Sequence, residues 1–229
     1  MNSRWFRSLI SASILLCLSA AESRAETIST VVGAGSQGSS GDGGLPTDAL
    51  LNRPSAVWSD SSGALFIADT GNNRIRRVNA ARDSIVTFAG TGSAGFSGDG
   101  ADAVRAALNA PTGVFVDSTG IVYVADTGNH RIRRIDSSGI IRTIAGKDTT
   151  AGLFIDDTLA TQATLSAPTA VFVRGGFIYI ADTGNHRIRR IDSSGFITTI
   201  AGKDTTTGIF IDDTLATQAT LNRPHGLYV

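Results

Sequence analysis

The side chains best suited to chemistry in this 229-residue chain belong to a ten-residue phrase that occurs three times. The copies start at Ala68, Ala125 and Ala181, so they lie 57 and 56 residues apart. Each contains an aspartate, an asparagine or histidine, and three arginines. An imidazole could act in acid–base chemistry or bind a metal, and paired arginines could hold a phosphate or a carboxylate.

Repetition favours a structural interpretation of most of these residues. Each aspartate precedes an arginine by five residues, so we expect an ion pair or hydrogen bonds that brace a turn. Two copies have histidine where the first has asparagine, which shares its hydrogen bonding but not its catalytic chemistry. The predicted structural set is Asp69, Asn73, Arg74, Asp126, His130, Arg131, Asp182, His186 and Arg187.

The arginine pairs that end each phrase leave two interpretations open. They could form a basic rim that binds phosphate or carboxylate groups. They could equally lie on a solvated outer strand, where a cation discourages pairing with another sheet edge. The pairs are Arg76 and Arg77, Arg133 and Arg134, and Arg189 and Arg190.

Acidic residues in the segments between the phrases are a further candidate group. Gly-Asp loops can hold calcium, but each segment offers one or two carboxylates and calcium takes six to eight oxygens. Capping of a following helix is the simpler role. These residues are Asp42, Asp99, the pair Asp156 and Asp157, and the pair Asp212 and Asp213.

The elements that carry these residues recur in a constant order. A proline precedes a short apolar run, and a glycine turn leads to a second run of β-branched and aromatic residues. The phrase then supplies a turn and a third run, and a fourth run ends in Ala-Gly. Four short strands per unit indicate an all-β fold, a β-propeller of four-stranded antiparallel blades, with a solenoid as the alternative. The connecting segments carry short helix candidates at 102–108 and 159–165.

The number of units is too small for a closed ring. Complete blades are predicted at 52–90, 109–146 and 166–202, whereas a ring needs at least four. Residues 27–33 match a fourth strand and residues 221–229 match a first strand, and neither has the rest of its blade. We expect either a truncated gene product or an arc that a homodimer closes into a ring. Exposed apolar blade faces would favour such association.

The phrase Ile-Ala-Asp-Thr-Gly-Asn-His-Arg-Ile-Arg, preceded by Pro-Thr-Ala-Val-Phe-Val, resembles the NHL repeat. The segment Ser97-Gly98-Asp99-Gly100 resembles the long-linker form found in exported microbial proteins. The likeness covers nearly everything after residue 27. It implies a propeller, usually six-bladed, that most often acts as a binding platform. Family members also include lyases and relatives of lactonases.

His225 is the residue on which an enzymatic interpretation depends. The sequence Pro224-His225-Gly226-Leu227 resembles the motif by which NHL-type peptidyl-hydroxyglycine lyases supply zinc-ligating histidines. Catalytic zinc takes three protein ligands. The equivalent positions in the other units are Ser55, Thr112 and Thr169. We therefore predict no catalytic, cofactor-binding or metal site, and keep His225 as a weak metal candidate.

The first 25 residues have the pattern of a secretory signal peptide. Arg4 and Arg7 precede an apolar run at 9–21, and a small residue, Ala25, precedes the expected cleavage point. The predicted mature domain is 26–229, and the single cysteine, Cys17, lies in the segment removed. We expect a secreted, extracellular or periplasmic protein without a further membrane span.

Charge and repetition limit the partners. The chain has 20 basic and 20 acidic residues, so it lacks the basic excess expected of a nucleic-acid-binding protein. Residues 144–165 and 200–221 differ at only two positions, and near-identical blades present the same groups several times. We predict a non-catalytic protein- or glycan-binding scaffold without a cofactor. The alternative is a fragment of a metal-dependent propeller enzyme similar to a peptidyl-hydroxyglycine lyase or a lactonase.

Overall fold

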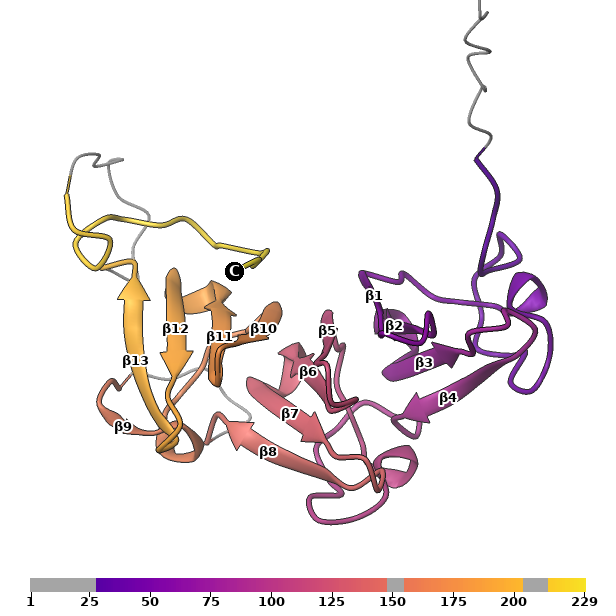
Figure 1. Ribbon diagram of the computed structural model, residues 1–229, viewed down its shortest axis with the longest axis horizontal. Helices are drawn as coiled ribbons and strands as arrows, with labels where there is room; N and C mark the ends of the chain where they lie inside the picture. The colour runs from indigo at the N-terminus through magenta and orange to yellow at the C-terminus, as the bar shows by residue number, and fades with distance from the viewer. Residues whose placement is uncertain (1–27, 148–154, 204–213) are drawn as a thin grey trace, which may run out of the picture.

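A computed structural model describes residues 28–147, 155–203 and 214–229, which form an arc of three antiparallel sheets (Figure 1). Blade 1 consists of β1 (Ala56–Ser59), β2 (Leu65–Asp69), β3 (Arg74–Val78) and β4 (Ile85–Ala89). Blade 2 consists of β5 (Gly113–Val116), β6 (Val122–Asp126), β7 (Arg131–Ile135) and β8 (Ile141–Ala145). Blade 3 consists of β10 (Ala170–Arg174), β11 (Phe177–Asp182), β12 (Arg187–Ile191) and β13 (Phe196–Ala201). The predicted all-β fold of four-stranded blades is confirmed.

The phrase forms the corner between the second and third strands of each blade. Its Thr-Gly-Asn makes a single 3-10 turn: η2 (Thr70–Asn72), η4 (Thr127–Asn129) or η6 (Thr183–Asn185). The next residue has a positive φ of 53–56° in all three copies. Asparagine and histidine tolerate this left-handed conformation better than most residues. The chain then reverses, so that the phrase aspartate pairs in register with the arginine five residues later.

The segment that precedes each blade covers the outer edge of that blade. In blade 2, Gly100 N donates to Ile141 O at 2.8 Å, and Ile141 N donates to Ala101 O at 3.0 Å. In blade 3 the same segment includes a short strand, β9 (Thr158–Leu159), paired with β13. Each outer strand therefore has a partner along part of its length, which limits pairing with other sheets.

The helices predicted at 102–108 and 159–165 are wrong. The structure has single 3-10 turns there, η3 (Ala103–Arg105) and η5 (Ala160–Gln162), and a third turn, η1 (Pro46–Asp48), before blade 1. Backbone groups in these segments bond to neighbouring blade strands and turns instead of continuing a helix. For example, Ala103 N donates to Gly139 O at 2.9 Å.

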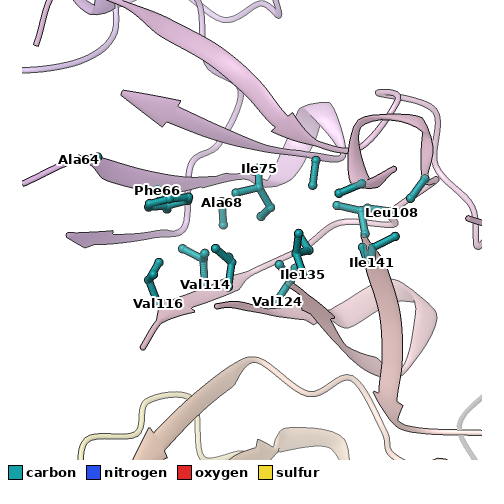
Figure 2. Close-up of a cluster of buried hydrophobic side chains, with 14 residues drawn as sticks. Ala64, Phe66, Ala68, Ile75, Leu108, Val114, Val116, Val124, Ile135 and Ile141 are labelled. Atoms are coloured by element: carbon teal, nitrogen blue, oxygen red, sulfur yellow. The ribbon is translucent and has the colours of Figure 1, made fainter. Parts of the chain in front are cut away.

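The hydrophobic core lies between blades rather than within them. Figure 2 shows Phe66, Ala68 and Ile75 of blade 1 facing Val114 and Val124 of blade 2. A second cluster joins blades 2 and 3 and is built from Phe115, Ala125, Ile132, Val171, Phe172 and Ile180. Each blade therefore needs its neighbour to bury its apolar face, as expected of a repeat architecture.

The strands predicted at the two ends of the arc are not formed in the described residues. Residues 28–33 and 221–229 contain no strand, because a strand needs a hydrogen-bonded neighbour and these segments have no adjoining sheet. Both still pack on the blades: Val32 contacts the cluster on the outer side of blade 1, and Leu227 contacts the cluster of blades 2 and 3. The predicted signal peptide, 1–25, lies outside the described residues.

No helix in the described ranges is long and apolar enough to cross a membrane.

Candidate functional site

The phrase aspartate is the centre of a buried polar network. Asp126 is fully buried, and its Oδ1 accepts a hydrogen bond from Asn109 N at 2.8 Å. Its Oδ2 accepts from Asn129 Nδ2 at 2.8 Å and from Arg133 Nη1 at 3.2 Å. The buried Arg133 guanidinium also pairs with Asp99 Oδ1 at 2.8 Å. One arginine thus joins the turn of its own blade to the segment that leads into that blade.

The other two blades repeat this network. Arg76 bridges Asp69 and Asp42, and Arg189 bridges Asp182 and Asp156, with the same arginine atoms in each blade. The expected ion pair therefore joins the aspartate to the arginine seven residues later, not five. The linker acids Asp42, Asp99 and Asp156 are ion-pair partners rather than helix caps or a calcium cluster. Asp212 and Asp213 lie outside the described residues.

Burial affects the ionisation of these aspartates. Desolvation raises the pKa of the Asp126 carboxyl, and the hydrogen bonds from Asn109, Asn129 and Arg133 act in the opposite direction. The pKa of Asp182 is raised by burial in the same way. The hydrogen bonds of the network thus offset part of the free-energy cost of placing a charged carboxylate in the interior.

The predicted basic rim is wrong for half of its members. Arg76, Arg133 and Arg189 are fully buried, so they cannot contact a ligand at the surface. The other three, Arg77, Arg134 and Arg190, are half-buried on the third strands. Two of them lie over aromatic rings: Arg77 is 5.7 Å from the Phe66 centroid and Arg190 is 4.8 Å from that of Phe177.

The first arginine of each phrase fixes the end of the fourth strand. Arg131 Nη1 donates to Gly146 O at 2.7 Å, and Arg187 Nη1 donates to Gly202 O at 2.9 Å. Arg74 Nη2 donates to Thr91 O at 3.1 Å. These side chains hold carbonyl groups that strand pairing leaves free, which is a structural role.

The asparagine or histidine of each phrase links its blade to the next segment. Ala110 N donates to Asn73 Oδ1 at 2.8 Å, and Ala167 N donates to His130 Nδ1 at 2.9 Å. Arg223 N donates to His186 Nδ1 at 3.1 Å. An accepting Nδ1 carries no proton, so both imidazoles are the neutral Nε2–H tautomer. The three donor residues have φ of 44–48°, so these bonds hold a left-handed backbone just before each proline.

Stability is expected to fall in mild acid because of His130, and His130→Asn should reduce that fall. Burial lowers the pKa of His130, so its contribution is complete above the ordinary pKa of about 6.5. It is lost as pH falls from there through the lower folded-state pKa, because the unfolded chain binds the proton more readily. Asparagine preserves the acceptor, as Asn73 does, and does not titrate.

Urea unfolding measured across this pH range tests the expectation. The exposed His225 has no hydrogen-bond partner for its imidazole among the described residues, so His225→Asn serves as the control. The control should lose stability in acid as the wild type does. An acid loss in His130→Asn equal to that of the wild type would contradict the assigned hydrogen bond.

A second set of links runs along the inner strands, and the sequence analysis missed it. Ser55 Oγ donates to Thr112 O at 2.9 Å, and Thr112 Oγ1 donates to Thr169 O at 3.1 Å. Thr169 Oγ1 in turn donates to His225 O at 3.0 Å. The phrase threonines add parallel bonds to the proline carbonyls, as in Thr70 Oγ1 to Pro111 O at 2.7 Å. The recurrence of that threonine in every phrase was the available signal.

The candidate metal ligand is isolated. His225 ends the series of inner-strand hydrogen bonds, in which its backbone carbonyl accepts the bond from Thr169. Its exposed side chain is not part of a metal-binding group among the described residues. In the described part of the chain, no three His, Cys, Asp or Glu side chains gather to hold a metal ion. The polar side chains of the phrases instead bond to backbone and to one another.

Blades that share their cores and are tied by repeated polar links define a β-propeller repeat protein. Residues 88–154 match the family model described as Teneurin NHL domain, and residues 167–191 match the model described as NHL repeat. Chicken NHL repeat-containing protein 2 is 34% identical over 95 residues, covering 41% of this chain and 13% of that protein. These matches identify NHL repeats within the chain.

Two further similarities agree with this assignment. Human Teneurin-4 is 30% identical over 213 residues, which cover 82% of this chain and 8% of the relative. The chain thus spans about a tenth of the length of these curated relatives. A crystal structure of a Bacteroides thetaiotaomicron protein of unknown function superposes with a TM-score of 0.58 at 21% identity, covering 75% of this chain and 41% of that one. At that identity the likeness concerns the fold.

Proposed function

We propose that this chain is a non-catalytic binding and scaffold module. The observation that carries the proposal is the use of the phrase side chains. The aspartates and the histidines are engaged in holding the blades, and so are Arg76, Arg133 and Arg189. An active site needs groups that are free to meet a substrate. Stoichiometric zinc in the purified protein would contradict the proposal and favour the lyase-like alternative.

The partner is a protein rather than a glycan, and it docks on the open side of blade 1. Val57 is 60% exposed, whereas Val114 and Val171, at the same register position in the other blades, are each 6% exposed. Val57 lines an apolar cleft of about 620 Å³ together with Val31, which is 44% exposed, and Leu65. This end face is defined by Val31, Val57 and Leu65. The residues equivalent to Val57 in blades 2 and 3, Val114 and Val171, are buried in the clusters between blades.

A second copy of the chain fits this end face best. The face has the apolar character of the two interfaces between blades. The surface that complements it is therefore the apolar face of another blade. Light scattering is expected to give about twice the chain mass, and Val57→Asp should give the monomer, because a buried unpaired carboxylate opposes association.

Val86→Asp is the matched control, since Val86 is 41% exposed on β4 and lies outside the end-face cleft. It should leave the mass of the wild type unchanged. A wild type that stays monomeric at every concentration would exclude the second copy as the partner.

This module works outside the cytoplasm. The support is the signal-peptide pattern of residues 1–25, in which a basic start is followed by an apolar run and small residues. The mass of the exported protein should correspond to a start at Glu26. Recovery of the uncleaved chain from the cytoplasm alone would contradict export.

A further inference from the structure

Blade 3 departs from the repeat at the turn between its first two strands. In blades 1 and 2 this turn begins with Asp60 or Asp117, whose Oδ1 accepts backbone N–H groups two and four residues later. In blade 3 the turn is one residue shorter, and Arg174 takes the place of the aspartate. Gly175 and Gly176, with φ of 60° and 80°, form a two-residue hairpin turn that needs no side-chain bond. The change leaves the side chain at this position free of a folding role.

Arg174 lies at a cleft of about 540 Å³ between blades 2 and 3. Phe115, Val173 and Ile178 give the cleft an apolar lining, and the buried Tyr123 adds an aromatic ring with a hydroxyl. This volume falls in the usual range for small-molecule sites, about 300–1,000 Å³. The cleft can therefore take a ligand built around a single ring.

The charges around the cleft favour an anion. Arg174 is exposed, and its side chain has no hydrogen-bond or ion-pair partner among the described residues. Asp117 is already engaged: Oδ1 serves the turn and Oδ2 accepts from the Tyr123 hydroxyl at 3.4 Å. Burial raises the pKa of Tyr123, which keeps this hydroxyl neutral, and Arg134 lies opposite Tyr123 in the strand register. Of the two charged residues that line the cleft, Arg174 is therefore the one without a partner, and Asp117 is already hydrogen-bonded.

We propose that this cleft binds a small carboxylate carried on an aromatic body. The Arg174 guanidinium pairs with the carboxylate, because its planar fork matches the two oxygens. Phe115 and Ile178 contact the ring. The same chemistry is offered by a free aromatic acid and by the C-terminus of a peptide. The site is independent of the proposed protein contact, since it uses other elements than the end face of blade 1.

Titration of the full chain with N-acetylphenylalanine, followed by NMR, tests the proposal. The amide signals of Gly175 and Gly176 should shift to saturation. The matched probe N-acetylphenylalanine amide has the same ring without the charge, and we expect it to bind at least about tenfold more weakly, the effect of 1.4 kcal/mol. Equal binding of the two probes, or no saturable shift with the acid, would overturn the proposal.

Two variants locate the charge that is responsible. Arg174→Gln should weaken binding of the acid about tenfold, to the level of the amide probe. Arg142→Gln removes an exposed arginine on β8 and should leave the affinity unchanged. Loss of binding in Arg142→Gln alone would assign the ligand to another place. Phenylacetate distinguishes the two sources: binding as tight as that of N-acetylphenylalanine assigns the site to a free acid, and weaker binding assigns it to a peptide C-terminus.

Discussion

Replacing Asp126 by alanine is expected to destabilise the protein by about 3–5 kcal/mol, the cost of breaking one partner out of a buried ion pair. The change leaves the Arg133 guanidinium in the interior with one anionic partner fewer. It also removes the acceptor of Asn109 N and Asn129 Nδ2. Buried donors without acceptors carry their full desolvation cost, so no compensating gain is available.

The midpoint of urea unfolding measures this effect. Asp102→Ala is the control, because Asp102 and Arg105 form an exposed ion pair at 4.0 Å whose contribution is small. The control should unfold near the wild-type midpoint, and Asp126→Ala should unfold at much lower urea. If both variants unfold together, the buried network does not stabilise the blades.

Replacing Gly146 by alanine is expected to cost about 3 kcal/mol, from backbone strain together with overpacking. Gly146 has φ of +93°, and a Cβ there would lie 2.3 Å from the carbonyl oxygen of His130. Relief requires a shift of the backbone at residue 146 or at His130, and the His130 backbone positions the imidazole that joins blade 2 to the next segment.

Gly139→Ala separates strain from the steric clash. Gly139 also has a positive φ, +80°, but a Cβ there would have no atom within 4 Å. It should lose only about 1–2 kcal/mol, the cost of a left-handed conformation. Thermal unfolding of the two variants compares them. An equal loss would mean that the clash at His130 is relieved without cost.

The blades could be predicted from the sequence because their signals are local. Each strand corresponds to a run of β-branched residues bounded by glycine turns. The same pattern occurs in three units, so each strand could be recognised three times. The helix at 102–108 was predicted wrongly because a short alanine-rich segment is compatible with a helix when considered alone. Its backbone instead satisfies the edge of blade 2, as in the bond from Ala103 N to Gly139 O. The edge of blade 2 forms only when the chain folds, so residues 102–108 alone do not reveal it.

The partners of the site residues depend on tertiary packing, which the local pattern does not contain. The sequence analysis left Arg133 either in a basic rim or on a solvated outer strand, and both interpretations expose its guanidinium. In the structure the Arg133 guanidinium is buried and pairs with Asp99, 34 residues earlier. The same spacing separates Asp42 and Arg76, so a recurrent distance between opposite charges was the missed signal. The exchange of asparagine and histidine did indicate a hydrogen-bonding role, but not its donor 37 residues later.

The central claim is that the polar side chains of the phrase join blades and do not act on a substrate. The most direct measurement is the tautomer and charge of the histidines by 15N NMR at neutral pH. His130 and His186 should both be neutral with the proton on Nε2, and with Nδ1 accepting from the amides of Ala167 and Arg223. Averaged signals at His130 and His186, or a proton on Nδ1, would contradict the claim.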